Sequence, residues 1–177
     1  MRITMRASVL AAPLALATLT GCGMSDDKSD GVPSAGTSTS HDAVETMKKT
    51  SSGIYDLIGV KGKASDNDPG VTECSGKDSK KYFRIYHPWS FSPASASDLA
   101  EAMARLKREL PKHGWKIVAY GPNTSKNKSV EMTADHDKKK VSVTVVNMSK
   151  SDPPILSLNL VSGCYQVPDG QKVDLYP

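Results

Sequence analysis

Hydrophobic residues in the second half of the chain alternate with polar ones, which is the pattern of half-buried β-strands. The alternation covers residues 130–134, 141–145 and 156–160, and the aromatic and β-branched residues of 115–120 indicate a further strand. Short polar connections separate these four segments. Because consecutive strands joined in this way pair as antiparallel neighbours, we predict a four-stranded meander with one buried face and one face exposed to water.

Two other segments have hydrophobic residues at helical spacing. The first begins at Asp42, a suitable N-cap residue, and ends before Gly59, a typical glycine at a helix C-terminus. Residues 50–53 are Thr, Ser, Ser and Gly, which are weak helix formers, so a break in this helix stays open. The second helix is predicted over residues 97–110, with capping residues at its start and Pro111 just after its end.

The segment between the two helices has shorter signals. Two short strands are expected on either side of a turn at residues 67–70, and residues 82–86 are strand-like. Pro88 and Pro93 lie close together, and proline is rarely tolerated inside a sheet. We therefore predict a loop at residues 87–93.

These elements define the expected fold class. They predict one α+β domain over residues 42–177, in which an antiparallel meander sheet of about four to six strands has helices packed on one face. The length is suitable for a single domain, and the chain contains no internal repeat.

The first 21 residues have the three parts of a secretory signal. Arg2 and Arg6 make a positive start, and the apolar run at residues 7–19 is shorter than the ~20 residues that span a bilayer. The run ends in Leu-Thr-Gly before Cys22, which is similar to the bacterial lipobox. This similarity implies cleavage before Cys22 and a diacylglyceryl group on its thiol. An ordinary secretory signal followed by an incidental cysteine is the alternative.

A lipobox implies that Cys22 anchors the mature chain to the extracytoplasmic face of the cell membrane through fatty acyl chains such as palmitate. Two acyl chains hold a protein far more firmly than one, since each buried methylene contributes ~0.8 kcal/mol. Residues 22–41 are mostly Ser, Thr, Gly, Asp and Lys. Such a composition cannot bury enough apolar surface to fold, so we predict that residues 22–41 are the lipidated cysteine and a flexible tether.

The charge of the mature chain is close to balance. Without Arg2 and Arg6 it has 21 Lys and Arg against 19 Asp and Glu. This balance excludes nucleic acid as an expected partner. The one basic run, Lys138-Lys139-Lys140, is interpreted as a solvated hairpin turn, with contact to anionic lipid or teichoic acid as the alternative.

Cys74 and Cys164 are the two cysteines that remain after Cys22. An even pair in an exported protein predicts a disulfide. The alternative, a metal site, finds no Cys-x-x-Cys spacing or histidine cluster. A Cys74–Cys164 bond closes a loop of about 90 residues, for which chain entropy gives about 4–5 kcal/mol of stabilisation.

Candidate catalytic motifs are missing from the sequence. There is no Gly-x-Ser-x-Gly, and the four histidines share no spacing that would pair them. Residues 66–68 lack the glycine and the terminal glutamate of a calcium loop, and residues 70–77 depart from the spacing of a phosphate loop. We therefore expect no catalytic residues, no metal and no cofactor.

The most distinctive remaining feature is the proline-bounded segment that contains His87, Trp89 and Phe91. Aromatic side chains exposed on a rigid loop are typical contact anchors, so these three residues are our candidates for contact with a ligand or partner. The alternative is that Trp89 and Phe91 close the end of the core. Burial of both side chains would refute the contact hypothesis.

Several stretches of the mature chain resemble a group of lipoproteins from Streptomyces-type actinobacteria. Beside the lipobox and the tether, the similar stretches are residues 54–59 (Ile-Tyr-Asp-Leu-Ile-Gly), 70–74 (Gly-Val-Thr-Glu-Cys), 113–117 (His-Gly-Trp-Lys-Ile) and 162–165 (Ser-Gly-Cys-Tyr). The resemblance covers most of the mature chain. It implies a surface location without a particular activity, and it supports the disulfide because both cysteines lie in these stretches.

The leading functional hypothesis is a membrane-anchored envelope lipoprotein with a non-catalytic binding or accessory domain. Its partners would be the membrane, through the lipid anchor, and an envelope protein or cell-wall ligand. The alternatives are a hydrolase that acts on cell-wall material through carboxylates distant in the sequence, and a structural subunit of an envelope complex.

Overall fold

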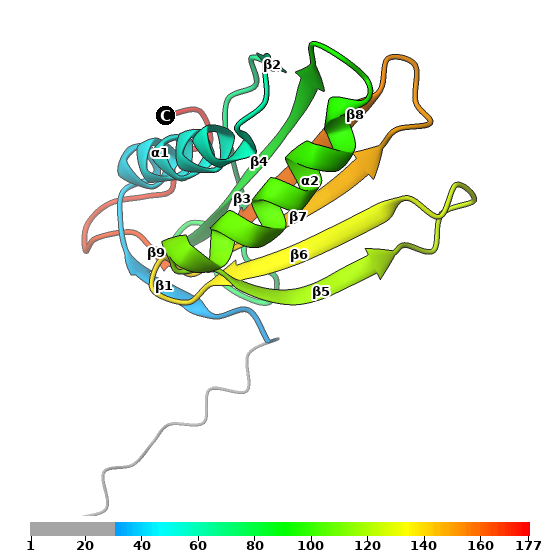
Figure 1. Cartoon of the computed structure of the whole chain (residues 1–177). Helices are drawn as coiled ribbons and strands as arrows, with labels where there is room; N and C mark the ends of the chain where they lie inside the picture. The colour runs from blue at the N-terminus through cyan, green and yellow to red at the C-terminus, as the bar shows by residue number, and fades with distance from the viewer. Residues whose placement is uncertain (1–30) are drawn as a thin grey trace, which may run out of the picture.

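The computed structural model describes residues 31–177. The predicted signal segment, Cys22 and residues 23–30 of the predicted tether lie outside the described residues. Two helices lie against one sheet (Figure 1). The elements are β1 (Ser34–Thr37), α1 (Ser40–Ile58), β2 (Gly62–Ala64), β3 (Gly70–Glu73), β4 (Tyr82–Pro93), α2 (Asp98–Glu109), a 3₁₀ turn (Leu110–His113), β5 (Lys116–Pro122), β6 (Val130–His136), β7 (Val141–Met148), β8 (Ile155–Ser162) and β9 (Cys164–Gln166).

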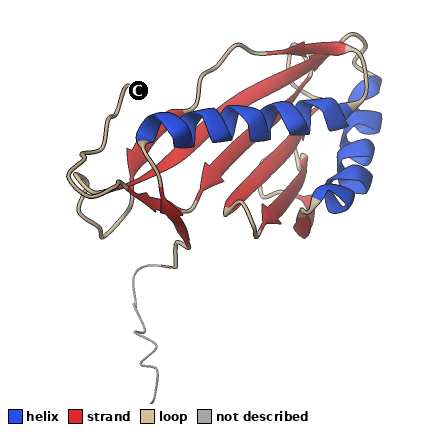
Figure 2. Ribbon diagram, turned by 90° about the vertical axis from the view of Figure 1, so that its left-hand side faces the viewer, coloured by secondary structure: helices blue, strands red, loops and turns tan. Residues whose placement is uncertain are grey.

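The predicted α+β class is confirmed, but the sheet is larger than predicted. Strands β5 to β8 form the expected antiparallel meander. Beyond β8 the sheet continues in the order β4, β9, β1. Along one edge β4 pairs with β8 and then with β9, and along its other edge it pairs with β2 and β3. The sheet therefore has nine strands rather than four to six. Strand β1 is parallel to β9, so the sheet is mixed. Both helices lie on the same side of it (Figure 2).

The predicted loop at residues 87–93 is wrong, because β4 runs without interruption from Tyr82 to Pro93. Ile85 directs its backbone N–H toward β8, and Ser90 directs its own toward Ser65. By alternation, the missing N–H of Pro88 is on the Ser90 side. There, β3 pairs only with residues 83–86 and β2 only with residues 91–93, so Pro88 leaves no strand hydrogen bond unmade.

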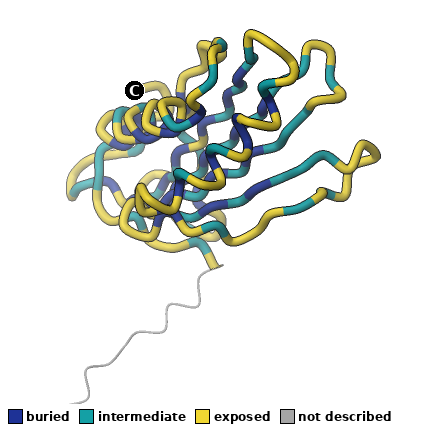
Figure 3. The backbone as a smooth tube through the Cα atoms, viewed as in Figure 1, coloured by how far each residue is buried: buried dark blue, intermediate teal, exposed yellow. Residues whose placement is uncertain are grey.

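The core lies between the sheet and the two helices. Alternate residues of β4, β6, β7 and β8 are buried (Figure 3). The largest fully buried side chains are Phe83, Phe91, Met47, Ile54, Ile58, Ile85, Leu99, Leu106, Leu110, Met132, Leu156 and Leu158. The opposite face of the sheet stays half exposed, as the period of two predicts.

Helix α1 is continuous through the weak run at residues 50–53. The hydroxyls of Thr50 and Ser52 donate to the carbonyls of Thr46 and Lys48 in the preceding turn, so both side chains are accommodated within the helix. The helix begins two residues before Asp42, with Thr39 as the N-cap that accepts a hydrogen bond from the Asp42 N–H at 3.1 Å. It ends at Gly59, which has φ of 66°.

The ordered domain begins before the predicted boundary at residue 42. Residues 34–37, placed in the tether by their composition, form β1 beside β9. The N–H of Cys164 donates to the carbonyl of Pro33 at 2.8 Å, and the N–H of Ser38 donates to that of Gln166 at 2.9 Å. These bonds use only backbone groups, so a composition of Ser, Gly and Thr gives no sign of them.

The predicted disulfide between Cys74 and Cys164 is confirmed. It joins the connection between β3 and β4 to the start of β9, across 90 residues, with the two Cα atoms 6.0 Å apart. That separation is common for disulfides. No helix in residues 31–177 is long and apolar enough to cross a membrane.

Candidate functional site

A cleft of about 300 Å³ lies between helix α1, the connection from β2 to β3, and the middle of β4. It is at the lower end of the size range of ligand sites. The residues that line it are Lys48, Ser51, Ser52, Tyr55, Ala64, Ser65, Asn67, His87 and Trp89. Two of the three predicted contact residues, His87 and Trp89, are therefore brought to this cleft.

His87 is the best-fixed polar side chain of the cleft. It lies on the helix-facing side of β4 and is only 6% exposed. Its Nε2 is 2.7 Å from the carbonyl oxygen of Asn67, and its Nδ1 is 2.7 Å from the hydroxyl of Ser51. A carbonyl only accepts, so we assign the proton of the neutral ring to Nε2. Nδ1 then accepts a hydrogen bond from Ser51.

The environment of His87 favours the neutral imidazole. Burial lowers the pKa of His87 below its usual value, and the nearby Lys48 cation acts in the same direction. The Asn67 carbonyl and the Asp68 carboxylate oppose this shift without reversing it. At neutral pH the ring is therefore an uncharged bridge between α1 and the β2–β3 connection.

Aromatic rings form one wall of the cleft. The ring centroids of Tyr55 and Trp89 are 6.5 Å apart, and those of Tyr55 and Phe91 are 6.1 Å apart. Tyr55 is 39% exposed, whereas Trp89 is 6% exposed and Phe91 fully buried. Within residues 31–177, the buried indole Nε1 of Trp89 has no hydrogen-bond partner.

The one cation that lines the cleft, Lys48, is paired with two carboxylates. The ammonium of Lys48 is 3.0 Å from the Asp68 carboxylate and 3.4 Å from that of Glu45. The hydrogen bond to Asp68 raises the pKa of Lys48, so the lysine stays charged and paired. This pair also joins α1 to the β2–β3 connection, as His87 does from the other side.

The contact-loop hypothesis for His87, Trp89 and Phe91 is wrong in its original form. All three belong to a central strand rather than a loop, and the aromatic pair Trp89 and Phe91 is buried, which is the core alternative that the sequence left open. Sequence reasoning missed Ser51 and Asn67 as hydrogen-bond partners of His87, and Tyr55 as a residue of the cleft. Their separation of 20 residues or more along the chain gave no signal of this contact.

The cleft lacks the parts of a hydrolytic site. Ser51 and His87 are at the distance of a nucleophile and its base. Ser51, however, is 6% exposed and lies in the middle of α1, where the backbone N–H groups are bonded within the helix and none is free to stabilise an oxyanion. No carboxylate lines the cleft. Residues 31–177 contain no group of three or more side chains placed to hold a metal ion.

The other histidines lie away from the cleft. His41 and His113 are exposed at the surface, and His136 packs edge-on against Trp115 at 5.2 Å. Burial lowers the pKa of His136, and the neighbouring Lys139 contributes in the same direction. These positions support structural rather than chemical roles.

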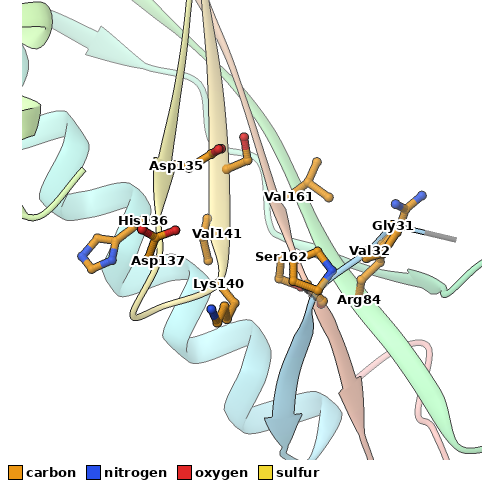
Figure 4. A pocket seen from close by; sticks show the side chains of 13 residues that line it. Gly31, Val32, Arg84, Asp135, His136, Asp137, Lys140, Val141, Val161 and Ser162 are labelled. Atoms are coloured by element: carbon orange, nitrogen blue, oxygen red, sulfur yellow. Dashed lines mark hydrogen bonds between the residues drawn. The ribbon is translucent and has the colours of Figure 1, made fainter. Parts of the chain in front are cut away.

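A second hollow of about 350 Å³ lies at the far side of the sheet (Figure 4). Arg84, Asp135, Ser142 and Val161 reach it from the open face of the sheet, and residues 31–33 close one side. The ring of His136 turns away from Arg84 and Val161 in this view. Charges of both signs are mixed here, and Arg84 makes no ion pair among the described residues. The cleft beside α1 is the better-ordered site, because its polar groups are fixed by hydrogen bonds.

No protein-family model, curated protein or solved structure matches this chain.

Proposed function

We propose that this chain is a lipid-anchored lipoprotein of the cell envelope, whose domain binds a small uncharged polar ligand in the cleft beside α1. The observation that supports it most is the rigid cleft around His87, which combines fixed polar groups with an exposed aromatic ring. Such a combination is typical of a binding site. The domain is proposed to be non-catalytic.

The anchor proposal depends on the sequence of residues 1–22 and gains support from the domain. The lipobox-like Leu-Thr-Gly-Cys22 follows a positive start and a short apolar run. The Cys74–Cys164 disulfide is typical of a protein that matures in an oxidising compartment outside the cytoplasm. The resemblance inferred from the sequence to lipoproteins of Streptomyces-type actinobacteria implies the same location.

The polarity of the cleft selects the class of ligand. His87 is neutral and Lys48 is already paired with Asp68 and Glu45, so no unpaired cation lines the cleft to bind a phosphate or a carboxylate. Ser52 and Ser65 line it beside Tyr55, which is 39% exposed. A neutral molecule with several hydroxyl or amide groups and one apolar face, such as a short glycan, fits this chemistry.

Binding can be tested by ligand-observed NMR with a panel of neutral oligosaccharides and soluble cell-wall fragments. We expect saturation transfer from the wild-type protein and binding about three- to tenfold weaker for Tyr55→Ala, since an aromatic contact contributes about 0.5–1.5 kcal/mol. Ser142→Ala, on the open face of the sheet, is the matched control and should bind normally. A Tyr55→Ala protein that binds as tightly as wild type, or no binding by wild type, would refute the proposed site.

A further inference from the structure

Three consecutive exposed lysines lie beside the point where the described chain begins. Lys138, Lys139 and Lys140 form the turn between β6 and β7, and all three are exposed. Lys140 and Gly31 line the same hollow, in the view of Figure 4. The carbonyl of Lys140 accepts a hydrogen bond from the Gly163 N–H at 2.7 Å, and the next residue, Cys164, donates its N–H to the carbonyl of Pro33. The turn and the entry of the chain are therefore neighbours.

The turn is held in one conformation. The N–H of Lys139 lies 3.1 Å from the carbonyl oxygen and 3.3 Å from Nδ1 of His136, whose ring packs against Trp115. Lys140 has φ of 52°, the left-handed conformation that closes the turn. The lysine side chains therefore project from a fixed base instead of a mobile loop.

The described residues around the turn are positively charged overall. Lys112 and Lys116, on the neighbouring 3₁₀ turn and β5, are exposed near it. Among residues 31–177, the nearby acids are Asp135, opposite Lys116 in the sheet; Asp137, at the start of the turn; and Glu109, which is paired with Arg108 and Lys112. Lys138 to Lys140 have no ion-pair partner among the described residues.

We propose that the Lys138–Lys140 turn docks the anchored domain on the anionic phospholipid surface of the membrane. This inference rests on the proposed lipid anchor. Eight residues separate Cys22 from Gly31, and these nine Cα–Cα steps can reach only about 30 Å. The anchor therefore keeps the turn close enough to enter the layer, about 8–10 Å deep at physiological salt, in which surface charges act.

Docking by this turn leaves the ligand cleft accessible. The residues of the cleft come from α1, the β2–β3 connection and the middle of β4, and none comes from the β6–β7 turn. The turns that join β5 to β6 and β7 to β8 lie at the opposite ends of these strands, where Lys150 bonds to the Asn127 carbonyl. Lys126, Lys128 and Lys150 at that end would face away from the membrane.

The test is lysine footprinting on the full, lipidated protein reconstituted into vesicles. An amine-acylating reagent is applied to protein in pure phosphatidylcholine vesicles and in vesicles with 30% phosphatidylglycerol, and modified peptides are quantified by mass spectrometry. We expect acylation of Lys138 to Lys140 to fall several-fold in the anionic vesicles and to recover in 1 M salt. Lys126, Lys128 and Lys150 are internal controls and should react equally in both.

A variant with Lys138, Lys139 and Lys140 all replaced by Gln separates docking from anchoring. The lipid on Cys22 should keep this variant on the vesicles. Each lysine at an anionic surface strengthens association about fivefold, so any protection that the neighbouring Lys112 and Lys116 show in anionic vesicles with the wild type should be lost in the variant. Equal acylation of the turn in both kinds of vesicle, with the protein still membrane-bound, would refute docking alone. Failure of the wild type to remain with either vesicle would refute the anchor, and docking with it.

Discussion

Individual residues stabilise this domain through buried hydrogen bonds as well as through apolar packing. His87 is the clearest case, because one ring joins the middle of α1 to the connection between β2 and β3. Leaving a buried polar group without its hydrogen-bond partner costs about 1–3 kcal/mol of stability. Replacing His87 would leave such a group on α1 and another on the β2–β3 connection. Its neutral state also makes the domain sensitive to acid.

The first prediction concerns the pH dependence of stability. The native pKa of His87 is lower than the value in the unfolded chain, so the unfolded state binds more protons between these two values. The free energy of unfolding should therefore be fully retained above the unfolded pKa of about 6.5 and decrease as the pH falls below it. His87→Gln removes this contribution.

Urea unfolding at pH 7.5 and pH 5.5 measures the effect. We expect the wild-type protein to lose more stability on acidification than His87→Gln, by up to about 1.4 kcal/mol for each pH unit between the two pKa values. His136, which is also shifted, is present in both proteins and cancels. An equal loss in the two proteins would contradict the neutral, buried state of His87.

At the scale of elements, local rules predicted most helices and strands, and the errors have a physical cause. Alternation identified β6, β7 and β8 because their buried residues form one regular row. The segment around Pro88 was assigned to a loop because the sequence does not reveal that β2 and β3 leave a gap opposite it. Likewise β1 is held by backbone bonds that any residues could make.

Helix α1 offers a test of how its glycines act. Gly53 is exposed, has a right-handed conformation within the helix and has open space where a Cβ would lie. Gly53→Ala should raise the free energy of unfolding by about 0.5–1 kcal/mol, because the unfolded chain loses freedom and the helix gains propensity. Chemical denaturation measures this difference.

Gly59→Ala is the contrasting variant. This residue has φ of 66°, and an added Cβ would collide with the side chain of Arg105. It should therefore destabilise the protein, although both changes are Gly→Ala and lie six residues apart. Similar effects of the two substitutions would show that α1 does not run as described.

For the whole molecule, the sequence was sufficient for the fold class and the disulfide, and insufficient for the site. The number of cysteines and the helical and strand periods of the hydrophobic residues can be taken directly from the sequence. The cleft is formed by three segments that are distant in the sequence, and their meeting depends on strand pairing along both edges of β4. Nothing in the sequence distinguishes Ser51 and Asn67 from other polar residues, and only the structure shows that both form hydrogen bonds with His87.

The two proposals assign different functions to two separate surfaces of the domain. The cleft beside α1 is proposed to bind a ligand. The β6–β7 turn, next to Gly31, is proposed to face the membrane. The docking proposal, and the envelope location proposed for the ligand site, depend on the chain being held at the membrane by Cys22. That anchor is therefore the central claim about the molecule.

Metabolic labelling with an alkynyl palmitate, followed by membrane fractionation after a high-salt wash, tests it directly. Wild type and a Cys74→Ala/Cys164→Ala variant should both acquire label on whatever protein accumulates, since neither disulfide cysteine is the lipid acceptor. Cys22→Ala should lose the label and be released from the membrane fraction. A Cys22→Ala protein that stays labelled and membrane-bound like wild type would contradict the account.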